Sequence, residues 1–555
     1  LVAGLRFDKS MRWNSTNVAF SRPVRWLLAL YGERVIPFTY AGIRSGRVTF
    51  GLRFHEPEEF CVDKPQAYFQ FLAGQGILLD GLERQERIRA QVSALALEVG
   101  GAIPDDPALL REVTNLVEAP AALRGSFDPF HLQLPPEVLM SVMRKHQRYF
   151  PVQRDGQLMP YFIAVANRGV QVDQDMALIV EGNEHVIRAR FADAAFFVRD
   201  DLKRPLEAFL PRLGTLTFQA RLGSMLDKVQ RVVELIDLLA PQVGLNPQET
   251  DIARRAARLC KADLATKMVV EMTSLQGIMG RYYALHSGES PDVANAIFEH
   301  ILPRFAGDGL PQTRPGLVVG LADRLDTLVG LFAVGMAPSG ARDPFSLRRA
   351  ALGLVQTLLA HKLDFDLRPA LEAAASRLPI PDSPERALRI ADCQGFIIER
   401  LRNLLLEAGA KYDVVEAVIS AQGWNPARAA RAVEELSAWV ARPDWHTILP
   451  AYARCVRITR DQAERYPVQP ETFEEPAEGE LWAALQTAES APRSPGSADD
   501  FLNAFLPMIP AIERFFIDVL VMAEDARLRC NRLGLLQRIA ALADGVAEMS
   551  RLEGF

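Results

Sequence analysis

Hydrophobic and polar positions follow two different patterns along the chain. In residues 24–54, the short β-branched and aromatic runs VRWLLALYG, RVIPFTYAGI and GRVTFGLRF are broken by Gly and Pro, which is typical of short strands. Residues 80–101 instead repeat apolar positions every three or four residues and end in paired glycines, which predicts a helix. YFPVQRDGQLMPYFIAVAN predicts a hairpin with RDGQ as its turn. We therefore expect residues 1–205 to form an α+β region.

From about residue 206 onward the strand pattern nearly disappears and helical periods replace it. They are clear in RLGSMLDKVQRVVELIDLLAPQVG, IARRAARLCKADLATKMVVEM, PGLVVGLADRLDTLVGLFAVG and LRRAALGLVQTLLAHKL. The sequence thus predicts a multidomain, mostly α protein, with helical domains over 206–361, 362–445 and 446–555. The Ser-, Pro- and Gly-rich stretch ESAPRSPGSADD (489–500) is predicted to separate two helices of the last domain.

Composition narrows the class of protein. A chain of 555 residues is too long for one hydrophobic core, so several domains are expected. Its apolar runs are shorter than the roughly 18 residues that span a bilayer, and its five cysteines are scattered singly, as in a cytoplasmic protein. The net charge of −6 disfavours nucleic-acid binding over the whole surface but leaves room for a local basic face. Because the first residue is Leu, we expect the chain to begin inside a longer one.

Two helical fragments suggest a degenerate metal site. In LADRLDTLVG, Asp323 stands where an HD-type phosphohydrolase presents its last metal ligand, and LCKADLATKM has Ala262-Asp263 where the His-Asp pair belongs. Residues 186–285 contain no His, so neither the dyad His nor the upstream His is present. Two carboxylates alone do not make a tight transition-metal site. We therefore predict no metal and no catalytic residue here.

A purely structural role is the alternative for these residues. Asp263 could be a buried hydrogen-bonding carboxylate, and Asp323 could pack a helix or pair with the adjacent Arg324. His286 and His300 lie between the two carboxylates, and either could in principle be a ligand. An HD-type nucleotide phosphohydrolase is the rival function, but it needs the missing histidines. No phosphate-binding loop, nucleophile elbow or synthetase ATP signature is found.

The most distinctive string is GMAPSGARDPFSLRRAALGL (335–354). Its residues predict a helix with Asp343 as N-cap, Pro344 at the first helical position, and Arg348 and Arg349 one turn later. This string resembles the β subunits of the bacterial tetrameric glycyl-tRNA synthetases. Further colinear blocks carry the same resemblance: KSMRW (9–13), FSRPVRWLLAL (20–30), GIRSGRVTFGLRF (42–54), EGNEHVIRARFADAAFFVRDD (181–201), LPRLGTLTFQARLGSMLDK (210–228), KADLATKMVVEMTSLQGIMGRYYA (261–284) and AEDARLRCNRLGLLQRI (523–539).

The resemblance implies an architecture and a division of labour. ATP, Mg²⁺ and glycine would be used at a partner α subunit in an α2β2 assembly, and this chain would hold no cofactor. Residues 1–205 would resemble the B3/B4 module of phenylalanyl-tRNA synthetase, and 206–361 a degenerate HD domain. A helical connecting domain (362–445) and an anticodon-binding domain similar to that of arginyl-tRNA synthetase (446–555) would follow. Glycine tRNA would be the RNA partner, with no membrane partner.

Candidate tRNA contacts come from local arginine patterns. Residues 441–555 hold 12 Arg and no Lys against 18 Asp and Glu, so an RNA contact must use a patch. Guanidinium groups suit phosphates, and Asn or Tyr can read or stack an unpaired base. Two patches are predicted: Tyr452, Arg454, Arg457 and Arg460; and Arg527, Arg529, Asn531, Arg532 and Arg538. Weaker candidates are Lys9, Arg12, Arg22, Arg25, Arg348 and Arg349. Each could instead be a solvated or acid-paired surface residue, and a freestanding RNA-binding protein is a third possible function.

Overall fold

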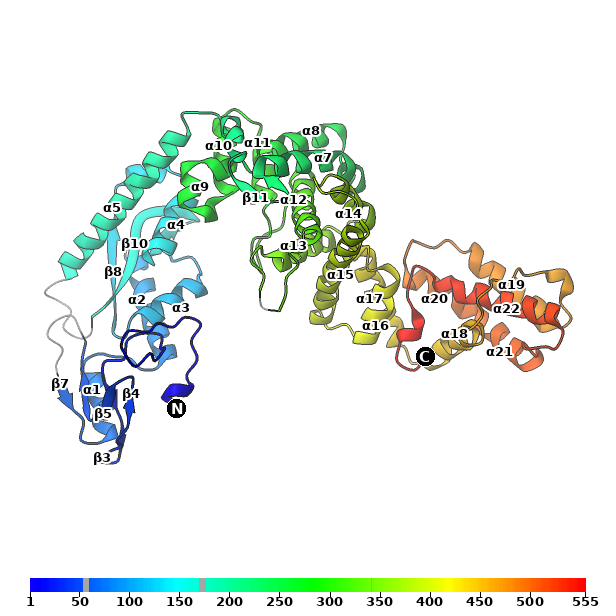
Figure 1. Ribbon diagram of the computed structural model, residues 1–555, viewed down its shortest axis with the longest axis horizontal. Helices are drawn as coiled ribbons and strands as arrows, with labels where there is room; N and C mark the ends of the chain where they lie inside the picture. The colour runs from blue at the N-terminus through cyan, green and yellow to red at the C-terminus, as the bar shows by residue number, and fades with distance from the viewer. Residues whose placement is uncertain (53–58, 169–175, 341) are drawn as a thin grey trace. The chain divides into compact units, whose positions relative to one another are not determined.

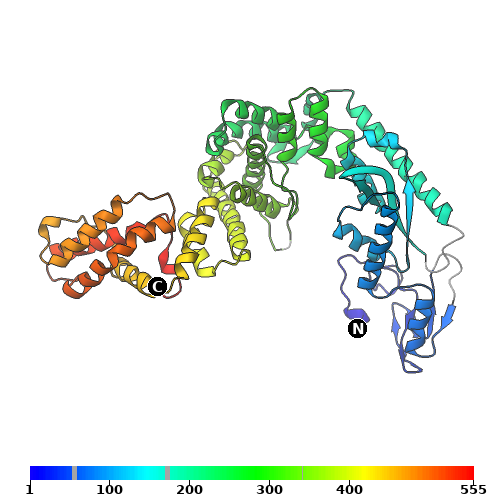
Figure 2. The ribbon, with the colours of Figure 1, turned by 180° about the vertical axis from the view of Figure 1, so that it is seen from behind.

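The computed structural model describes residues 1–52, 59–168, 176–340 and 342–555. The chain divides into two compact units, residues 1–203 and 204–555. The described residues are mostly helical, and four of their five small sheets lie in the first unit (Figure 1, and from behind in Figure 2). The predicted mostly α chain that begins with a mixed region is therefore confirmed. The finer division at residues 361 and 445 stays a prediction.

Short strands pair locally at the start of the first unit. Strand β1 (Leu27–Leu28) is parallel to β5 (Ile43–Gly46), which is antiparallel to β4 (Thr39–Tyr40). The other elements here are β2 (Leu30–Tyr31), β3 (Arg34–Val35), β6 (Val48–Phe50), β7 (Glu59–Cys61) and α1 (Pro65–Gly74). The three predicted strand runs thus contain β1 to β4 and β6, whereas β5 spans the junction between the second and third runs. The last two residues of GRVTFGLRF, at positions 53–54, lie outside the described residues.

An antiparallel sheet forms the larger core of the first unit. Its order is β8 (Pro120–Ser126), β10 (Gln157–Asn167) and β9 (Phe150–Arg154). The predicted hairpin is confirmed, because Asp155 and Gly156 join β9 to β10 with positive φ angles of 51° and 77°. Two positive φ angles in a two-residue loop suit the twist of a hairpin.

Helices cover this sheet. The predicted helix is α2 (Gly81–Leu97), which Asp80 caps, and α2 packs with α3 (Pro107–Leu116) against β9 and β10 in one hydrophobic core. The remaining elements of the unit are α4 (Pro136–Ser141), a π-helical turn (Val142–Gln147) and the long α5 (Met176–Asp201).

The first part of the second unit surrounds one buried helix, α12 (Arg314–Ala333), whose Asp323 and Asp326 lie among apolar neighbours. Helices α7, α8, α11, α13, α14 and α15 all pack against it. The elements are α6 (Leu210–Leu213), β11 (Thr217–Gln219), β12 (Gly223–Ser224), α7 (Met225–Val243), α8 (Pro247–Leu259), α9 (Lys267–Glu271), α10 (Ile278–His286), α11 (Pro291–Glu299), α13 (Leu347–Ala360), α14 (Leu367–Ser376) and α15 (Pro384–Glu407).

The last helices of the unit run from yellow to red in Figure 1. They are α16 (Tyr412–Gln422), α17 (Pro426–Val440), α18 (Trp445–Thr459), α19 (Pro476–Ser490), α20 (Ala498–Phe505), α21 (Ile509–Asp518) and α22 (Ala526–Ala540). The predicted linker does separate α19 from α20. No helix of the described residues is both long and apolar enough to cross a membrane.

The start of α13 corrects one sequence prediction. The helix begins at Leu347, after Ser346 in a left-handed conformation, so Pro344 is not its first residue. The Asp343 carboxylate nevertheless accepts the N–H groups of Leu347 and Arg348, at 2.8 and 2.9 Å. The loop is therefore longer than predicted, although the same carboxylate caps the helix. Its residue 341 lies outside the described residues.

Candidate nucleic-acid interface

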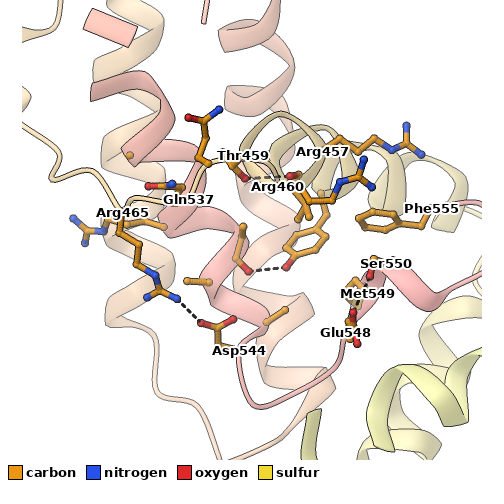
Figure 3. A pocket seen from close by; sticks show the side chains of 18 of the residues that line it. Arg457, Thr459, Arg460, Arg465, Gln537, Asp544, Glu548, Met549, Ser550 and Phe555 are labelled. Atoms are coloured by element: carbon orange, nitrogen blue, oxygen red, sulfur yellow. Dashed lines mark hydrogen bonds and ion pairs between the residues drawn. The ribbon is translucent and has the colours of Figure 1, made fainter. Parts of the chain in front are cut away.

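A pocket of about 530 Å³ opens at the C-terminal end of α18. Its walls come from α18, the segment 460–466, α22 and the last residues of the chain, 541–555 (Figure 3). Helices α18 and α22 pack against each other, and this packing holds their pocket-lining residues in place. The pocket therefore brings together segments that are up to about 100 residues apart in the sequence.

Exposed arginines line this pocket. Arg457 and Arg460 lie on the last turn and end of α18, and Arg465 lies on the following segment. The Arg457 guanidinium lies 5.6 Å from the ring centre of Phe555. Figure 3 labels these two residues next to each other at one side of the pocket. Planar cations beside an aromatic ring suit the phosphate and base of a single-stranded nucleotide.

The charge of the lining differs from that of its surroundings. The lining holds four arginines against the acids Asp544 and Glu548, whereas residues 441–555 as a whole carry a net charge of −6. Arg465 reaches Asp544 only at 3.9 Å and both are exposed, so this ion pair is weak. The pocket is thus a local basic site in an acidic region, as an RNA contact there would require.

A row of α22 residues fixes one wall of the pocket. The Asn531 amide accepts from Gln469 N–H at 2.7 Å and donates to Gln469 O and Thr472 Oγ1. Six residues further along α22, Gln537 accepts from the backbone N–H of Tyr466 at 3.0 Å and donates to the carbonyl of Glu464. Asn531 is therefore buried and committed to the backbone, which positions the segment beside the pocket.

Tyr452 is a packing residue of the same site. Its side chain is buried, its hydroxyl donates to the carbonyl of Ala540 at 2.6 Å, and its ring meets Phe501 and Phe505 edge-on. Burial raises the pKa of Tyr452 above its ordinary value. The ring packs against α20 and the hydroxyl binds α22, so Tyr452 holds three helices together, and its contact with RNA stays a prediction.

Two arginines of the second predicted patch are held by carboxylates. Arg532 is buried and pairs with Glu478, Nε to Oε1 at 2.8 Å, and it also donates to Leu520 O. Arg538 pairs with Glu489 and lies 4.6 Å from the ring centre of Trp482, at the pocket edge. Arg532 therefore stabilises the helical packing, whereas Arg538 keeps a partly exposed edge on the pocket.

The other members of the two patches lie outside the pocket lining. Arg454 is exposed over Phe516, at 4.4 Å, and Arg527 is exposed with Asp525 at 4.0 Å. Arg529 donates to the carbonyl of Ala523 at 2.9 Å. The structure thus gathers Arg457, Arg460 and Arg538 at one site and leaves these three on other surfaces.

The weaker candidates fall into two groups. Lys9, Arg12, Arg22 and Arg25 are all exposed, on segments that the paired backbones of Met11 and Phe20 hold side by side. In the second unit, Arg349 is exposed, and Arg348 donates to the carbonyl of Gly340 at 2.6 Å. Their contact with RNA stays a prediction.

Several lining residues were missed by the sequence patterns. Arg465 and Tyr466 lie in an irregular segment, where spacing carries no information about facing, and Phe555 is the last residue of the chain. Gln537 could have been found, because Asn531, Gly534 and Gln537 form a row at three-residue spacing on one helix face.

Two lysines, Lys261 and Lys228, bind the Asp323 carboxylate of the predicted metal-site remnant. Lys261 Nζ lies 2.8 Å from Asp323 Oδ2 and 3.1 Å from His300 Nε2. His300 is buried, and its Nδ1 meets the carbonyl of Ile297, which makes Nε2 the acceptor for Lys261. Burial lowers the pKa of His300 to about 3, with Lys261 adding to the effect, so the ring is neutral.

A second lysine, Lys228, pairs with the other oxygen of the Asp323 carboxylate. Lys228 Nζ lies 3.1 Å from Asp323 Oδ1, 3.0 Å from Asp326 Oδ2 and 2.8 Å from Thr327 Oγ1. Burial alone would lower the pKa of Lys228, but the two carboxylates outweigh it and raise that pKa. Asp323 therefore pairs with two lysines and not with Arg324, which donates to backbone carbonyls instead.

Asp263 belongs to a different environment. Its Oδ2 accepts the backbone N–H groups of Gly277 and Gly280, at 2.6 and 3.1 Å. It is thus the buried hydrogen-bonding carboxylate that the sequence allowed as the alternative. Burial raises the pKa of Asp263 to about 6.

These residues do not fit a metal ion. The ammonium groups of Lys228 and Lys261 lie 3.1 and 2.8 Å from the two carboxylate oxygens of Asp323, so they neutralise the charge that a metal ion would need. Asp263 Oδ2 accepts from the backbone, whereas Asp263 Oδ1 and Asp323 Oδ1 are buried without a hydrogen bond. Among the residues that the structure describes, no three His, Cys, Asp or Glu side chains are grouped to hold a metal. His286, the other ring that the sequence left open as a ligand, is exposed at the end of α10.

Comparison with known proteins gives consistent matches over the whole chain. Residues 1–420 match the family model described as glycyl-tRNA synthetase beta subunit. The chain is 42% identical over 559 residues to the glycine–tRNA ligase beta subunit of Moorella thermoacetica, covering 100% of this chain and 80% of that protein. It is 40% identical over 558 residues to the beta subunit of Desulforamulus reducens, with the same coverage. It is also 40% identical to glycine–tRNA ligase, chloroplastic/mitochondrial 2, of Arabidopsis thaliana, covering 52% of that longer protein.

Proposed function

The chain belongs to the glycyl-tRNA synthetase beta-subunit family, and from this membership we propose that it binds glycine tRNA for a partner alpha subunit. The alpha subunit would bind ATP, Mg²⁺ and glycine and carry out the glycylation in an α2β2 assembly in the cytoplasm. This chain would contribute RNA binding, including the anticodon end, and would carry no catalytic residue or cofactor of its own.

One observation on the structure supports the RNA-binding part most directly. The pocket at the end of α18 is lined by the exposed Arg457, Arg460 and Arg465, and Arg457 lies beside the ring of Phe555, within a region that is otherwise acidic. Two exposed guanidinium groups on one helix end can bind successive phosphates, and the ring offers an apolar face to an unpaired base. We therefore place an unpaired stretch of the tRNA at this pocket.

The test is equilibrium binding of glycine tRNA to the double variant Arg457→Ala/Arg460→Ala over a salt series. Losing two phosphate contacts should weaken binding by at least about tenfold and reduce the slope of log K against log salt by roughly 1 to 2. Arg514→Ala is the matched control, because Arg514 is an exposed arginine of the same helical region that pairs with Glu480. Equal affinities for the double variant and the control would contradict this placement.

A metal-dependent phosphohydrolase finds no support in the described residues. Its centre would need side chains that donate to a metal around Asp323, and two lysine ammonium groups bind that carboxylate instead. Manganese-dependent nucleotide hydrolysis that disappears in Asp323→Asn would revive this function. A freestanding RNA-binding role would be favoured instead if the chain bound tRNA but did not associate with an alpha subunit.

A further inference from the structure

A compact charged cluster lies between α7, the 3-10 turn Ala262–Ala265 and α12. Lys228 and Arg231 come from α7, Lys261 directly precedes the turn, and Asp323 and Asp326 come from α12. Four of the five are buried, with Lys228 2% exposed and Asp326 1% exposed, and the Asp323 side chain is 16% exposed. Isolated charges of this kind are very costly to bury, so their mutual pairing is what holds them here.

The pairing in this cluster is direct at every member. Arg231 binds Asp326 through two nitrogens, at 2.5 and 3.2 Å. Lys228 bridges the two carboxylates, and Lys261 joins Asp323 to the neutral His300. Three side-chain cations thus directly pair with two carboxylates, which leaves the cluster with a net charge of +1.

We propose that the ammonium groups of Lys228 and Lys261 are the permanent cations of this cluster. They occupy the place beside Asp323 that a divalent metal ion would occupy in a metal-binding site. The geometry carries this inference, because a carboxylate and an imidazole nitrogen converge on the Lys261 ammonium as they would converge on a metal. A divalent ion would add two charges to a cluster that is already positive. The centre is therefore a metal-free tie between helices, and this role is independent of the proposed RNA binding.

The wild-type chain offers the first test, through thermal unfolding with EDTA and with excess Co²⁺, whose absorption spectrum reports binding. We expect the melting temperature to stay within about 1 °C in both conditions and no stoichiometric cobalt band. A one-to-one cobalt band, or a stabilisation that EDTA reverses, would overturn the proposal. This arm requires no variant to fold.

The variants Lys261→Met and Lys228→Met test the stabilising role. Each removes one of the two lysines that pair with the buried Asp323 carboxylate and leaves it under-compensated, so the melting temperature should fall by roughly 10 °C, or the variant should fail to fold. Lys203→Met is the matched control, because Lys203 pairs with Asp200 at the same 2.8 Å on the surface. Lys261→Arg, which keeps the charge, should recover part of the loss. The proposal would be overturned if Lys261→Met had the same melting temperature as Lys203→Met.

A double variant tests whether the ammonium groups stand in a metal's place. Lys228→Met/Lys261→His removes two cations and adds an imidazole beside His300 and Asp323, which changes the cluster from +1 to −1. One divalent ion then restores the native total of +1. We expect Co²⁺ to bind this folded variant and raise its melting temperature. If the variant folds and ignores cobalt, the metal-like geometry is refuted, and if it does not fold, the wild-type arm and the Lys261→Met arm decide.

Discussion

At the scale of single residues, burial separates the arginines that hold the fold from those that can meet a ligand. Arg532 and Glu478 form an ion pair whose side chains are 7% and 1% exposed. Arg457 instead projects from the end of α18 at the mouth of the pocket. Both came from arginine-rich strings that look alike in sequence, so exposure in the structure decides which of them a binding experiment should change.

The first residue-scale prediction concerns Arg532. Replacing it with Met leaves Glu478 buried without its partner, which should lower the free energy of unfolding by about 3 to 5 kcal/mol. Urea unfolding followed by circular dichroism measures this loss. Arg527→Met is the control, because Arg527 is exposed and its contact to Asp525 is 4.0 Å, so we expect a change of less than about 0.5 kcal/mol. Similar losses in the two variants would contradict the structural role of Arg532.

The second residue-scale prediction follows from the pKa of Asp263, which burial raises to about 6. In the unfolded chain an Asp titrates near 3.9. Between pH 4 and pH 6 the folded protein therefore binds more protons at this carboxyl, so its stabilising contribution is complete below pH 4 and is lost as pH rises through 6. Asp263→Asn does not titrate and serves as the reference.

The measurement is the free energy of unfolding of both proteins at several pH values from 4 to 7. The wild-type value minus the Asp263→Asn value should fall by roughly 2 to 3 kcal/mol over this range. A difference that stays constant, or that grows with pH, would show that the Asp263 carboxyl is ionised in the folded protein at all these pH values.

At the scale of elements, one face of α22 determines the shape of the pocket. Asn531 and Gln537 bind the backbone of the segment 464–472, and Gly534 lies between them. A Cβ atom at Gly534 would come within 2.6 Å of the Tyr466 carbonyl oxygen. The glycine is thus required by a close approach of two backbones.

The element-scale prediction is that Gly534→Ala weakens both stability and tRNA binding. The displaced segment carries Arg465 and Tyr466, and overpacking of this kind costs about 1 to 3 kcal/mol. Gly479→Ala in α19 is the control, because nothing lies within 4 Å of its Cβ and Ala favours a helix, so it should be neutral or slightly stabilising. Chemical unfolding and tRNA titration of both variants test this prediction. A Gly534→Ala protein that binds tRNA as tightly as wild type would contradict it.

Local sequence patterns predicted the elements well, but they could not show which side chains the fold brings together. The hairpin at residues 150–167 and the apolar α12 followed directly from alternation and helical period. The start of α13 was placed too early because Asp343 caps across a longer loop than its sequence suggests. The commitment of Asn531 to Gln469 and of Lys228 to Asp326 depends on partners 62 and 98 residues away, which no local pattern contains.

At the scale of the whole molecule, the identification rests on similarity along the entire chain, and the proposed role rests on one basic pocket in an acidic region. The two compact units each carry exposed cations that the sequence marked as weaker candidates, such as Arg25 and Arg349. A tRNA that contacted both units would lose affinity by independent amounts when each group is changed. The pocket remains the site whose geometry is best matched to an unpaired stretch of RNA.

The most direct measurement of the central claim is equilibrium binding of this chain to glycine tRNA, to the same tRNA with a substituted anticodon, and to an unrelated tRNA, at several salt concentrations. We predict the tightest binding to glycine tRNA, a loss of at least about tenfold on anticodon substitution, and a further loss in Arg457→Ala/Arg460→Ala. Equal and weak binding to all three RNAs, unchanged in the double variant, would contradict the proposed role.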